Sequence, residues 1–322
     1  MSITIKQRWG RRGKAAVAFV MLTAMRKVTA HRPTVSIVGA GNLGSALAVN
    51  LSRAGYRIEF LVVRAGKKVS PETSKLARSV NARVIGMGGK PLASDLVWIT
   101  VPDDAIADVA TQLAAAQVWR GKTVFHSSGA LGSDLLSPLR KKGAKVASVH
   151  PGMTFVRQSV PLLKGVPFGV EGDAAAVRLA KELVSELGGS GYSIKPENKV
   201  LYHAFGAFAS PMLIALMTAL EQVGIAAGIE PSNLRTMAAP LLRQTLSNYL
   251  KHGAAAAFSG PLVRGDVATV HKHLAALANV PEARAAYLAL ATAALKNLPV
   301  KNRAEMDKEL RRIVGVKSIV KA

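Results

Sequence analysis

Short runs of β-branched and aromatic residues alternate with alanine-rich amphipathic stretches from Thr34 to about Ile194. The runs predict strands at Val35–Val38, Arg57–Val63, Ala82–Ile85, Leu96–Thr100, Thr123–His126, Lys145–Val149, Pro167–Val170 and Tyr192–Ile194. Helices are expected at Leu43–Arg53, Ala105–Ala115, Ser133–Lys141 and Ala174–Leu187. This alternation predicts a mostly parallel sheet with right-handed crossovers.

Beyond Pro196 the strand pattern stops, and long helical patterns follow at Val200–Ala226, Ser232–Lys251, Asp266–Ala278, Glu282–Leu298 and Lys301–Val314. The first of them is apolar on nearly every side, which predicts burial inside the domain or against another subunit. The fold class expected is therefore α/β: a Rossmann-type domain followed by an all-α domain. We expect a basic leader over residues 1–32, a nucleotide-binding domain over 33–198, and a helical domain for substrate and dimerisation over 199–322.

The first predicted strand runs into a Gly-x-Gly-x-x-Gly turn that continues as a helix. In such a turn the first glycine allows the tight bend, the second lets the backbone approach a pyrophosphate, and the third lets the helix pack on its strand. The N–H groups at the start of the helix then face the phosphates. The turn predicts a dinucleotide site formed by Gly39, Gly41, Asn42, Leu43 and Gly44.

The end of the second strand indicates which dinucleotide. An acidic residue there binds the ribose of NAD, whereas a basic residue accepts the extra phosphate of NADP. Glu59 lies 20 residues after Gly39 but falls early in its strand, and Arg64 follows the strand directly, with Lys67 and Lys68 nearby. Arginine makes paired contacts with phosphate, so the sequence favours NADP over NAD.

Charge and composition exclude several classes of function. The chain has 43 Lys and Arg against 19 Asp and Glu, a net charge of +24, and no cysteine, so thiol chemistry and disulfides are absent. Eight of those charges lie before Thr34, and no basic motif interleaved with aromatic residues accompanies the rest, so nucleic acid is not an expected partner.

The leader is interpreted as disordered or as a mis-assigned start, with an export signal as the alternative. It is too short for a membrane span, no membrane partner is expected, and the protein is expected in the cytoplasm.

Candidate chemistry gathers after the carboxyl ends of the strands, where parallel sheets bind ligands. Val101, Pro102 and Asp103 follow the fourth strand and are expected beneath the cofactor, and Asp103 or Asp104 is expected to cap the next helix. Further along, two histidines end strands among small polar residues and are candidates for moving the proton that accompanies hydride transfer. The expected catalytic groups here are His126, Ser128 and His150, with Ser127 beside the cofactor.

The helical half adds two candidates. Lys199 and His203 share a helix face, with Tyr202 beside them. Arg264 is expected to hold a substrate carboxylate or phosphate, and Asp266 to cap the helix that follows. No metal site is expected, because His271 and His273 diverge on a helix and no acidic cluster accompanies them.

These motifs resemble a family of bacterial Rossmann-like oxidoreductases whose C-terminal half is a domain of unknown function, within the pyrroline-carboxylate reductase and 6-phosphogluconate dehydrogenase superfamily. The resemblance runs from about Pro33 to Leu298 and is carried by Gly39–Gly44, Val101–Asp103, His126–Leu131, His150–Pro151, Tyr202–Ala204 and Gly260–Asp266. It implies NADP binding and a homodimer whose helical domains form part of the active cleft. In better-understood relatives a catalytic lysine is followed four residues later by asparagine; here Lys199 is followed by His203, and Pro211 is expected to kink the helix.

The sequence therefore predicts an NADP-dependent reductase or dehydrogenase acting on a small polar carbonyl or imine compound. The alternative is a non-catalytic NADP-binding sensor or scaffold, since each histidine also has a possible structural role. The substrate itself is not predicted.

Overall fold

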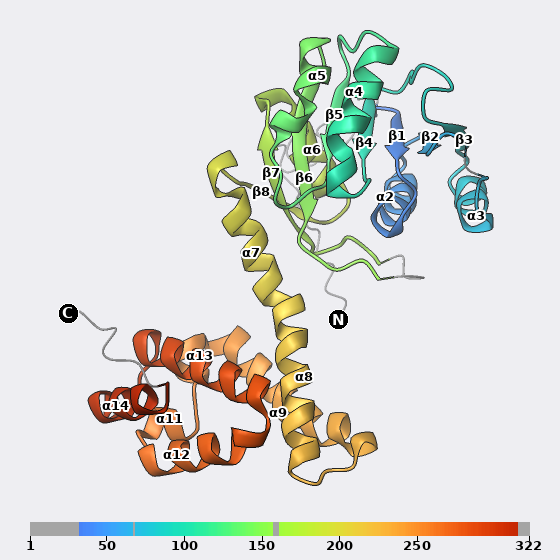
Figure 1. Cartoon of the computed structure of the whole chain (residues 1–322). Helices are drawn as coiled ribbons and strands as arrows, with labels where there is room; N and C mark the ends of the chain where they lie inside the picture. Colours follow the sequence, from blue (N-terminus) through green and yellow to red (C-terminus); the bar gives the residue numbers. More distant parts are fainter. Residues whose placement is uncertain (1–31, 67, 157–160, 315–322) are drawn as a thin grey trace, which may run out of the picture. The chain divides into compact units, whose positions relative to one another are not determined.

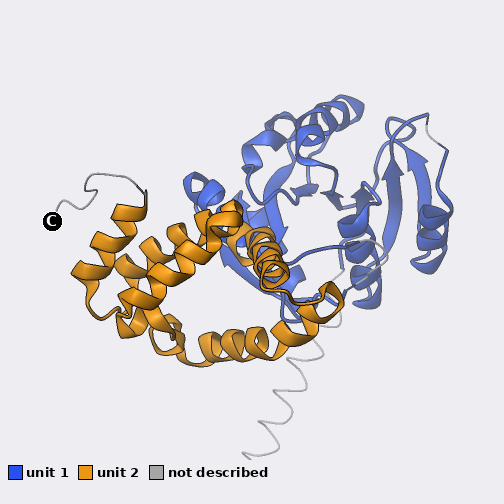
Figure 2. Cartoon of the chain, turned by 60° about the horizontal axis from the view of Figure 1, so that its bottom comes forward, with its two compact units in different colours: residues 1–206 blue, residues 207–322 orange. Residues whose placement is uncertain are grey.

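The computed structural model describes residues 32–66, 68–156 and 161–314, and Figure 1 shows the chain. Apart from Arg32, the basic leader expected over residues 1–32 lies outside the described residues. The chain divides into two compact units between Gly206 and Ala207, coloured blue and orange in Figure 2. The division falls inside a helix, eight residues after the boundary expected at 198.

Unit 1 contains one sheet with the strand order β3-β2-β1-β4-β5-β6-β7-β8 in the described part of the chain. The strands are β1 (Val35–Val38), β2 (Ile58–Val63), β3 (Arg83–Gly86), β4 (Leu96–Ile99), β5 (Thr123–His126), β6 (Lys145–Pro151), β7 (Pro167–Gly172) and β8 (Ser190–Ser193). The central strands β1 and β4 are buried at every position, as expected for apolar runs covered on both faces. Each of the predicted strands is present, within about two residues at its ends.

Helices cover the sheet on both faces (Figure 1). They are α2 (Asn42–Arg53), α3 (Pro71–Ser79), α4 (Ile106–Ala116), α5 (Ser137–Lys141) and α6 (Ala174–Glu186). Short 3-10 turns form η1 (Asp103–Ala105), η2 (Ser133–Leu136) and η3 (Pro196–Asn198), and α7 (Lys199–Ala209) follows η3. Alternate strand residues point to opposite faces. Val35 and Ile37 therefore pack with α2 and α6 in one core cluster, and Val38 packs with α4 and α5 in the other.

Helix α3 is absent from the sequence-based expectations, although its start carries a recognisable signal. Ser70 accepts a hydrogen bond from the Thr73 N–H at 3.1 Å, and Pro71 occupies the first helical turn. The helix is short and its pattern polar, so its periodicity gives little indication of it.

One pairing departs from the parallel arrangement: β7 runs antiparallel to β6, with Pro151 opposite Phe168. A parallel partner needs a crossover that carries the chain from the carboxyl ends of the strands back to their amino ends. Here β6 ends at Pro151 and β7 begins at Pro167, and the chain re-enters the sheet at the same end at which it left. The other pairs are parallel, so the sheet is mostly parallel as predicted.

Unit 2 is helical in its described residues. Its elements are α8 (Pro211–Ala226), α9 (Pro231–His252), α10 (Ala254–Ala257), α11 (Pro261–Arg264), α12 (Val267–Ala276), η4 (Leu277–Asn279), α13 (Pro281–Asn297) and α14 (Arg303–Val314). A small core joins α12, α13 and α14 through Val270, Leu274, Ala291, Leu295, Met306 and Leu310. Asp266 caps α12 as predicted, accepting the Thr269 N–H at 3.0 Å.

The apolar stretch expected over Val200–Ala226 is interrupted at Ser210, where Pro211 starts a new helix. The sequence predicted that this stretch is buried either inside the domain or against another subunit. Burial inside the domain is wrong, because α8 has no buried residue and the neighbouring α9 has only Leu234. Exposed large apolar residues include Phe205, Phe208, Ile214, Met237, Leu241 and Leu250. Among the described residues, one helix, Pro196–Ala226, is long and apolar enough to cross a membrane by length and composition alone.

Candidate functional site

The glycine-rich turn between β1 and α2 has the geometry that a dinucleotide requires. Gly39 has a φ of +100°, and a Cβ there would lie 3.0 Å from the Thr100 carbonyl oxygen. A Cβ on Gly44 would collide with the Gly39 carbonyl, so the third glycine lets the helix approach its strand. A Cβ on Gly41 would meet nothing within 4 Å, so the space in front of this glycine is open for a ligand.

The first turn of α2 is available to an anionic group. Gly41 is the N-cap, no side chain caps the helix, and the first turn holds no acidic residue. The Asn42 amide is turned to the loop after β6, where it donates to the Phe155 carbonyl at 3.1 Å, and Leu43 packs against the core. The open glycine and the uncapped N–H groups fit a pyrophosphate at this turn.

At the end of β2, Arg64 is exposed and follows the last strand residue directly. Glu59 lies near the start of the same strand and is engaged there. Its carboxylate accepts the Ser94 hydroxyl at 2.6 Å and lies 3.7 Å from Arg83. The carboxyl end of β2 therefore presents arginine and not glutamate.

The loop after β4 is linked to both of its neighbours. The Thr100 hydroxyl donates to the Gly39 carbonyl at 2.6 Å, and the Asp103 carboxylate accepts the Ser128 hydroxyl at 2.7 Å. Val101 is half-buried and Pro102 is exposed. Neither Asp103 nor Asp104 caps η1 or α4, so the expected capping role is wrong, because Asp103 points instead to the loop after β5.

The loop after β5 is built around His126, whose ring nitrogens both have partners. Nε2 lies 3.0 Å from the Gly132 carbonyl oxygen, and Nδ1 accepts the Ser128 N–H at 3.2 Å. Burial lowers the pKa of His126 to about 4, so the ring is neutral at pH 7. His126 and Ser128 are buried, whereas Ser127 is half-buried and accepts the Trp98 indole N–H at 2.7 Å.

The Ser128 hydroxyl also organises its own loop. It accepts the backbone N–H groups of Leu131 at 3.0 Å and Ala130 at 3.3 Å while donating to Asp103. With these partners, the hydroxyl holds a turn together.

His150 and Tyr202 form a pair that the spacing along the chain does not reveal. His150 Nδ1 lies 3.1 Å from the Tyr202 hydroxyl, and the two rings meet edge to face with centroids 5.6 Å apart. Burial, aided by the Lys199 and His203 charges, lowers the pKa of His150 to about 4. Burial raises the pKa of Tyr202. The pair therefore joins a neutral imidazole to a protonated phenol at neutral pH.

His203 completes this group of rings, with its centroid 6.1 Å from that of His150, and is exposed. Two glycines make room for the rings. A Cβ on Gly129 would lie 2.7 Å from His203 and 2.9 Å from His150, and one on Gly169 would lie 2.5 Å from the Tyr202 ring. The loop after β5 and strand β7 therefore carry glycine where α7 approaches.

Lys199 begins α7 and is 3% exposed, with its ammonium directed into the sheet. It lies 2.5 Å from the Ser148 hydroxyl, 3.2 Å from the Ser128 carbonyl oxygen and 3.8 Å from the Glu171 carboxylate. Sequence reasoning missed Glu171, an acidic residue directly after the apolar run predicted as a strand.

The remaining predicted residue, Arg264, lies in unit 2 at the end of α11, where it is exposed. Within unit 1, hydrogen bonds link Gly39 to Thr100 and Asp103 to Ser128, and the next residue, Gly129, lies against His150 and His203. No group of three or more His, Asp or Glu side chains able to hold a metal ion occurs in the described ranges.

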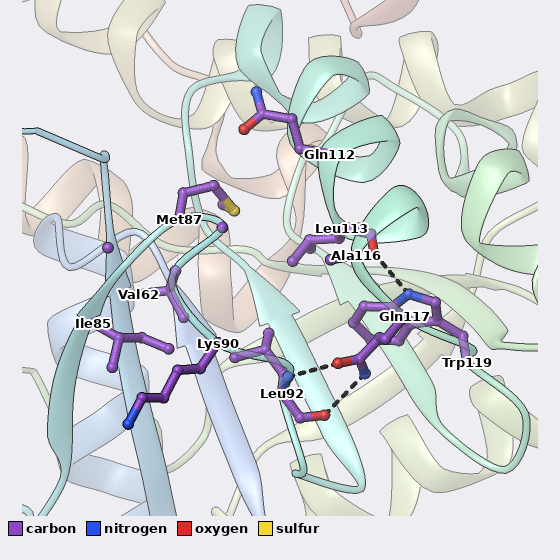
Figure 3. Close-up of a pocket in the computed structure, with 12 residues that line it drawn as sticks. Val62, Ile85, Met87, Lys90, Leu92, Gln112, Leu113, Ala116, Gln117 and Trp119 are labelled. Carbon is purple, nitrogen blue, oxygen red and sulfur yellow. Dashed lines mark hydrogen bonds between the residues drawn. The ribbon is translucent and has the colours of Figure 1, made fainter.

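A separate cavity lies beneath the connection from β3 to β4 (Figure 3). Gln117 closes it through two hydrogen bonds with the backbone of Leu92, at 2.7 and 2.9 Å. Its volume of about 20 Å³ admits roughly one water molecule, so it is packing space and not a ligand site.

Comparisons with known families match both parts of the chain. Residues 22–151 match the Rossmann-like domain, and residues 166–294 match a domain of unknown function, DUF2520. A segment of 143 residues is 28% identical to the mitochondrial 3-hydroxyisobutyrate dehydrogenase of Drosophila melanogaster and covers 41% of this chain. The chain spans only 37% of that dehydrogenase's length.

Two solved structures share the fold over most of this chain. A "putative NADP oxidoreductase" from Bacteroides fragilis has a TM-score of 0.66 at 20% identity, covering 81% of this chain and 97% of that one. A reductive aminase from Aspergillus terreus, in complex with NADPH and ethyl-5-oxohexanoate, has a TM-score of 0.59 at 17% identity, covering 87% and 100%. At these identities the likeness establishes a common fold.

The two later glycines of the turn predict different effects on stability. Gly44→Ala forces a Cβ against the Gly39 carbonyl and is expected to lower the free energy of unfolding by about 1–3 kcal/mol. Gly41→Ala, with open space at that position, is expected to stay within about 0.5 kcal/mol of the parent. Urea unfolding of both variants measures this; equal losses would contradict the geometry described for the turn.

Proposed function

Because the chain combines a Rossmann-like domain with a DUF2520 domain, we propose that it is an NADP-dependent oxidoreductase that reduces or oxidises a small polar carbonyl or imine compound. The observation that carries the proposal is the His150–Tyr202 hydrogen bond near the end of β6, which runs parallel to β1 and so ends at the same edge of the sheet as the glycine-rich turn. A proton-handling pair at that edge is what hydride transfer to a C=O or C=N group needs. The names of the reductive aminase and of the dehydrogenase segment support the same class.

The cofactor is proposed to bind at the turn described above. The N–H groups at the start of α2 and the open face of Gly41 hold its pyrophosphate, and Arg64 holds the phosphate that distinguishes NADP from NAD. When bound, NADP supplies or accepts a hydride. Val101, Pro102 and Asp103 are proposed to line the same edge.

Tyr202 is proposed as the group that exchanges a proton with the substrate. In the direction of reduction its hydroxyl donates to the carbonyl oxygen or imine nitrogen, and His150 in its Nδ1–H form stabilises the phenolate that remains. In the direction of oxidation neutral His150 accepts the Tyr202 hydroxyl proton at Nδ1 while the Tyr202 oxygen takes the proton from the substrate. The raised pKa of Tyr202 keeps the phenol protonated at neutral pH, as a proton donor must be.

The other predicted catalytic residues receive different roles. His126 and Ser128 are proposed to hold the loop after β5, because their polar atoms are engaged within the protein. His203, which is exposed next to His150, is proposed to contact the substrate. Arg264 is proposed to bind an acidic group on the substrate.

We also propose that two copies associate through the apolar surfaces of α8 and α9. Exposed side chains such as Leu241 and Leu250, 70% and 74% exposed, would otherwise face water. Association with a second copy also accounts for the apolar stretch over 200–226 that this chain leaves uncovered.

We also propose that the protein works in the cytoplasm, where NADP is supplied.

The proton-handling pair predicts a specific mutational pattern. Tyr202→Phe is expected to lower kcat by about 10²–10⁴-fold while leaving NADPH affinity unchanged, because only the hydroxyl is lost. The assay is NADPH oxidation across a panel of keto acids and imines. Tyr192→Phe, at a site 59% exposed, is the matched control and should behave as the parent.

The same pair predicts the pH dependence of oxidation. Because the pKa of His150 is lowered to about 4, kcat/KM is expected to hold through pH 6.5 and to fall as the pH drops through about 4. A fall in kcat/KM with a midpoint near pH 6.5 would contradict this.

The same substrate panel also separates an enzyme from a sensor. NADPH binding without turnover across the whole panel would favour a sensor over an enzyme.

Arg64 predicts the choice of cofactor. Arg64→Ala is expected to weaken NADPH binding by about 10-fold or more and to leave NADH binding unchanged, since a charged hydrogen bond to phosphate contributes about 1.5–3 kcal/mol. Fluorescence titration of both cofactors measures this. Arg53→Ala removes the same charge in the last turn of α2, at the end of that helix away from the glycine-rich turn, and should have no effect.

The apolar surface predicts the state of association. Sedimentation equilibrium is expected to give twice the chain mass of 33.8 kDa, and Leu241→Glu with Leu250→Glu is expected to give a single chain. Ser232→Glu, at an exposed polar position on α9, is the control. A parent protein that is monomeric, or that partitions into lipid vesicles, would overturn the proposal.

A further inference from the structure

Lys199 is the most enclosed charged side chain at the edge of the sheet where the site lies. At 3% exposure its ammonium is out of water, and a charge in that position is tolerated only when it is paired. Its two hydrogen-bond acceptors lie in the loop after β5 and on strand β6, and its ion-pair partner lies on strand β7.

The hydrogen-bond directions around Lys199 are determined by its partners. Lys199 donates to the Ser148 hydroxyl at 2.5 Å, and that hydroxyl donates onward to the Ser128 carbonyl at 3.0 Å, which also accepts from Lys199. An ammonium has three N–H donors and no acceptor. Two hydrogen bonds and an ion pair with Glu171 at 3.8 Å direct the ammonium into the protein, and the side chain is 3% exposed.

The carboxylate that balances this charge is also fully engaged. Glu171 is 5% exposed and accepts the Ser133 N–H at 2.7 Å and the Ser133 hydroxyl at 2.9 Å. The pair therefore extends from α7 through β7 to the start of η2, and both of its charges are held by groups of the protein.

Lys199 and its partner Ser148 each lie close in sequence to one member of the proton-handling pair. Ser148 precedes His150 by two residues on β6, so the two side chains lie on the same face of the strand. Lys199 precedes Tyr202 by three residues on α7, so these two lie on the same face of the helix. The buried ammonium of Lys199 thus joins α7 to β6 close to the point where Tyr202 meets His150.

We propose that Lys199 is a positioning residue that locks the first turn of α7 onto the sheet and thereby determines where Tyr202 meets His150. The inference rests on the proposed function for the reaction that the pair serves. The position of the pair, however, is a property of the chain alone. A lysine at this place acts through Ser148, Ser128 and Glu171 and does not touch the substrate.

The charge of Lys199 has a second effect on His150. The groups that face this ring are Lys199, Tyr202 and His203 from α7 and Asp103 from η1. Lys199 and His203 oppose a proton on His150, whereas Asp103 favours one. Removing the ammonium is therefore expected to raise the pKa of His150.

Proton NMR of the protein without cofactor tests the proposal. The ring Cε1–H of His150, identified among the seven histidines by its loss in His150→Gln, should titrate with a midpoint of about 4 in the parent. In Lys199→Met the midpoint should move upward, and the nuclear Overhauser contact between the His150 and Tyr202 rings should weaken. Lys195→Met removes the same charge at an exposed position and should leave both readings as in the parent.

A double variant separates the charge of Lys199 from the fold. Lys199→Met leaves Glu171 unpaired, so its thermal midpoint should fall. Lys199→Met with Glu171→Gln removes the unpaired charge while keeping a partner for Ser133, and should recover part of that loss. The weakened ring contact should persist in the double variant, which also carries the test if the single variant does not fold. Parent-like ring contacts and a parent-like His150 midpoint in the folded variants would overturn the proposal.

Activity provides an independent arm. Lys199→Met is expected to lower kcat by about 10-fold or more, with NADPH affinity unchanged, and to shift the acid limb of oxidation upward. If the parent oxidises no NADPH with any compound, the proposed function fails. The NMR readings then still decide the role of Lys199.

Discussion

A charge removed from water must find a partner, and this requirement shapes the edge of the sheet where the site lies. Lys199 and Glu171 are both nearly inaccessible, and each is held by hydrogen bonds in addition to the other's charge. Desolvating each ion costs several kcal/mol, which is offset only when the geometry is well determined. The pair therefore joins α7 to β7 in one arrangement, and the rings carried by α7 take their places from it.

Around this pair the loops are linked in a continuous series. Thr100 connects the glycine-rich turn to the end of β4, and Asp103 connects that loop to Ser128. The Ser128 carbonyl accepts from Lys199, which begins the helix that carries Tyr202. The glycine-rich turn and the His150–Tyr202 pair are therefore parts of one hydrogen-bonded edge.

Glycine has two separate uses in this edge. In the turn, the missing side chain of Gly41 leaves open space in front of the backbone. At Gly129 and Gly169 the missing side chain is replaced by rings of the protein itself, so these glycines serve packing. The glycine of the turn belongs to a sequence motif. The packing glycines do not, because the rings that they accommodate lie on α7, which begins about 70 residues after Gly129 and about 30 after Gly169.

Local pattern determined much of this protein. Apolar runs in the first part of the chain became strands, the glycine-rich turn stands where β1 meets α2, and Asp266 caps α12, because each depends on residues near one another in the chain. Tertiary structure decided what depends on distant residues. It made β7 antiparallel, left α8 and α9 exposed, turned Asp103 toward Ser128 and paired Tyr202 with His150. The local sequence does not distinguish the two histidines that end strands. The ring of His126 makes its hydrogen bonds within its own loop, whereas that of His150 makes one to a tyrosine 52 residues away. Only folding brings the partner, and the partner determines the chemistry.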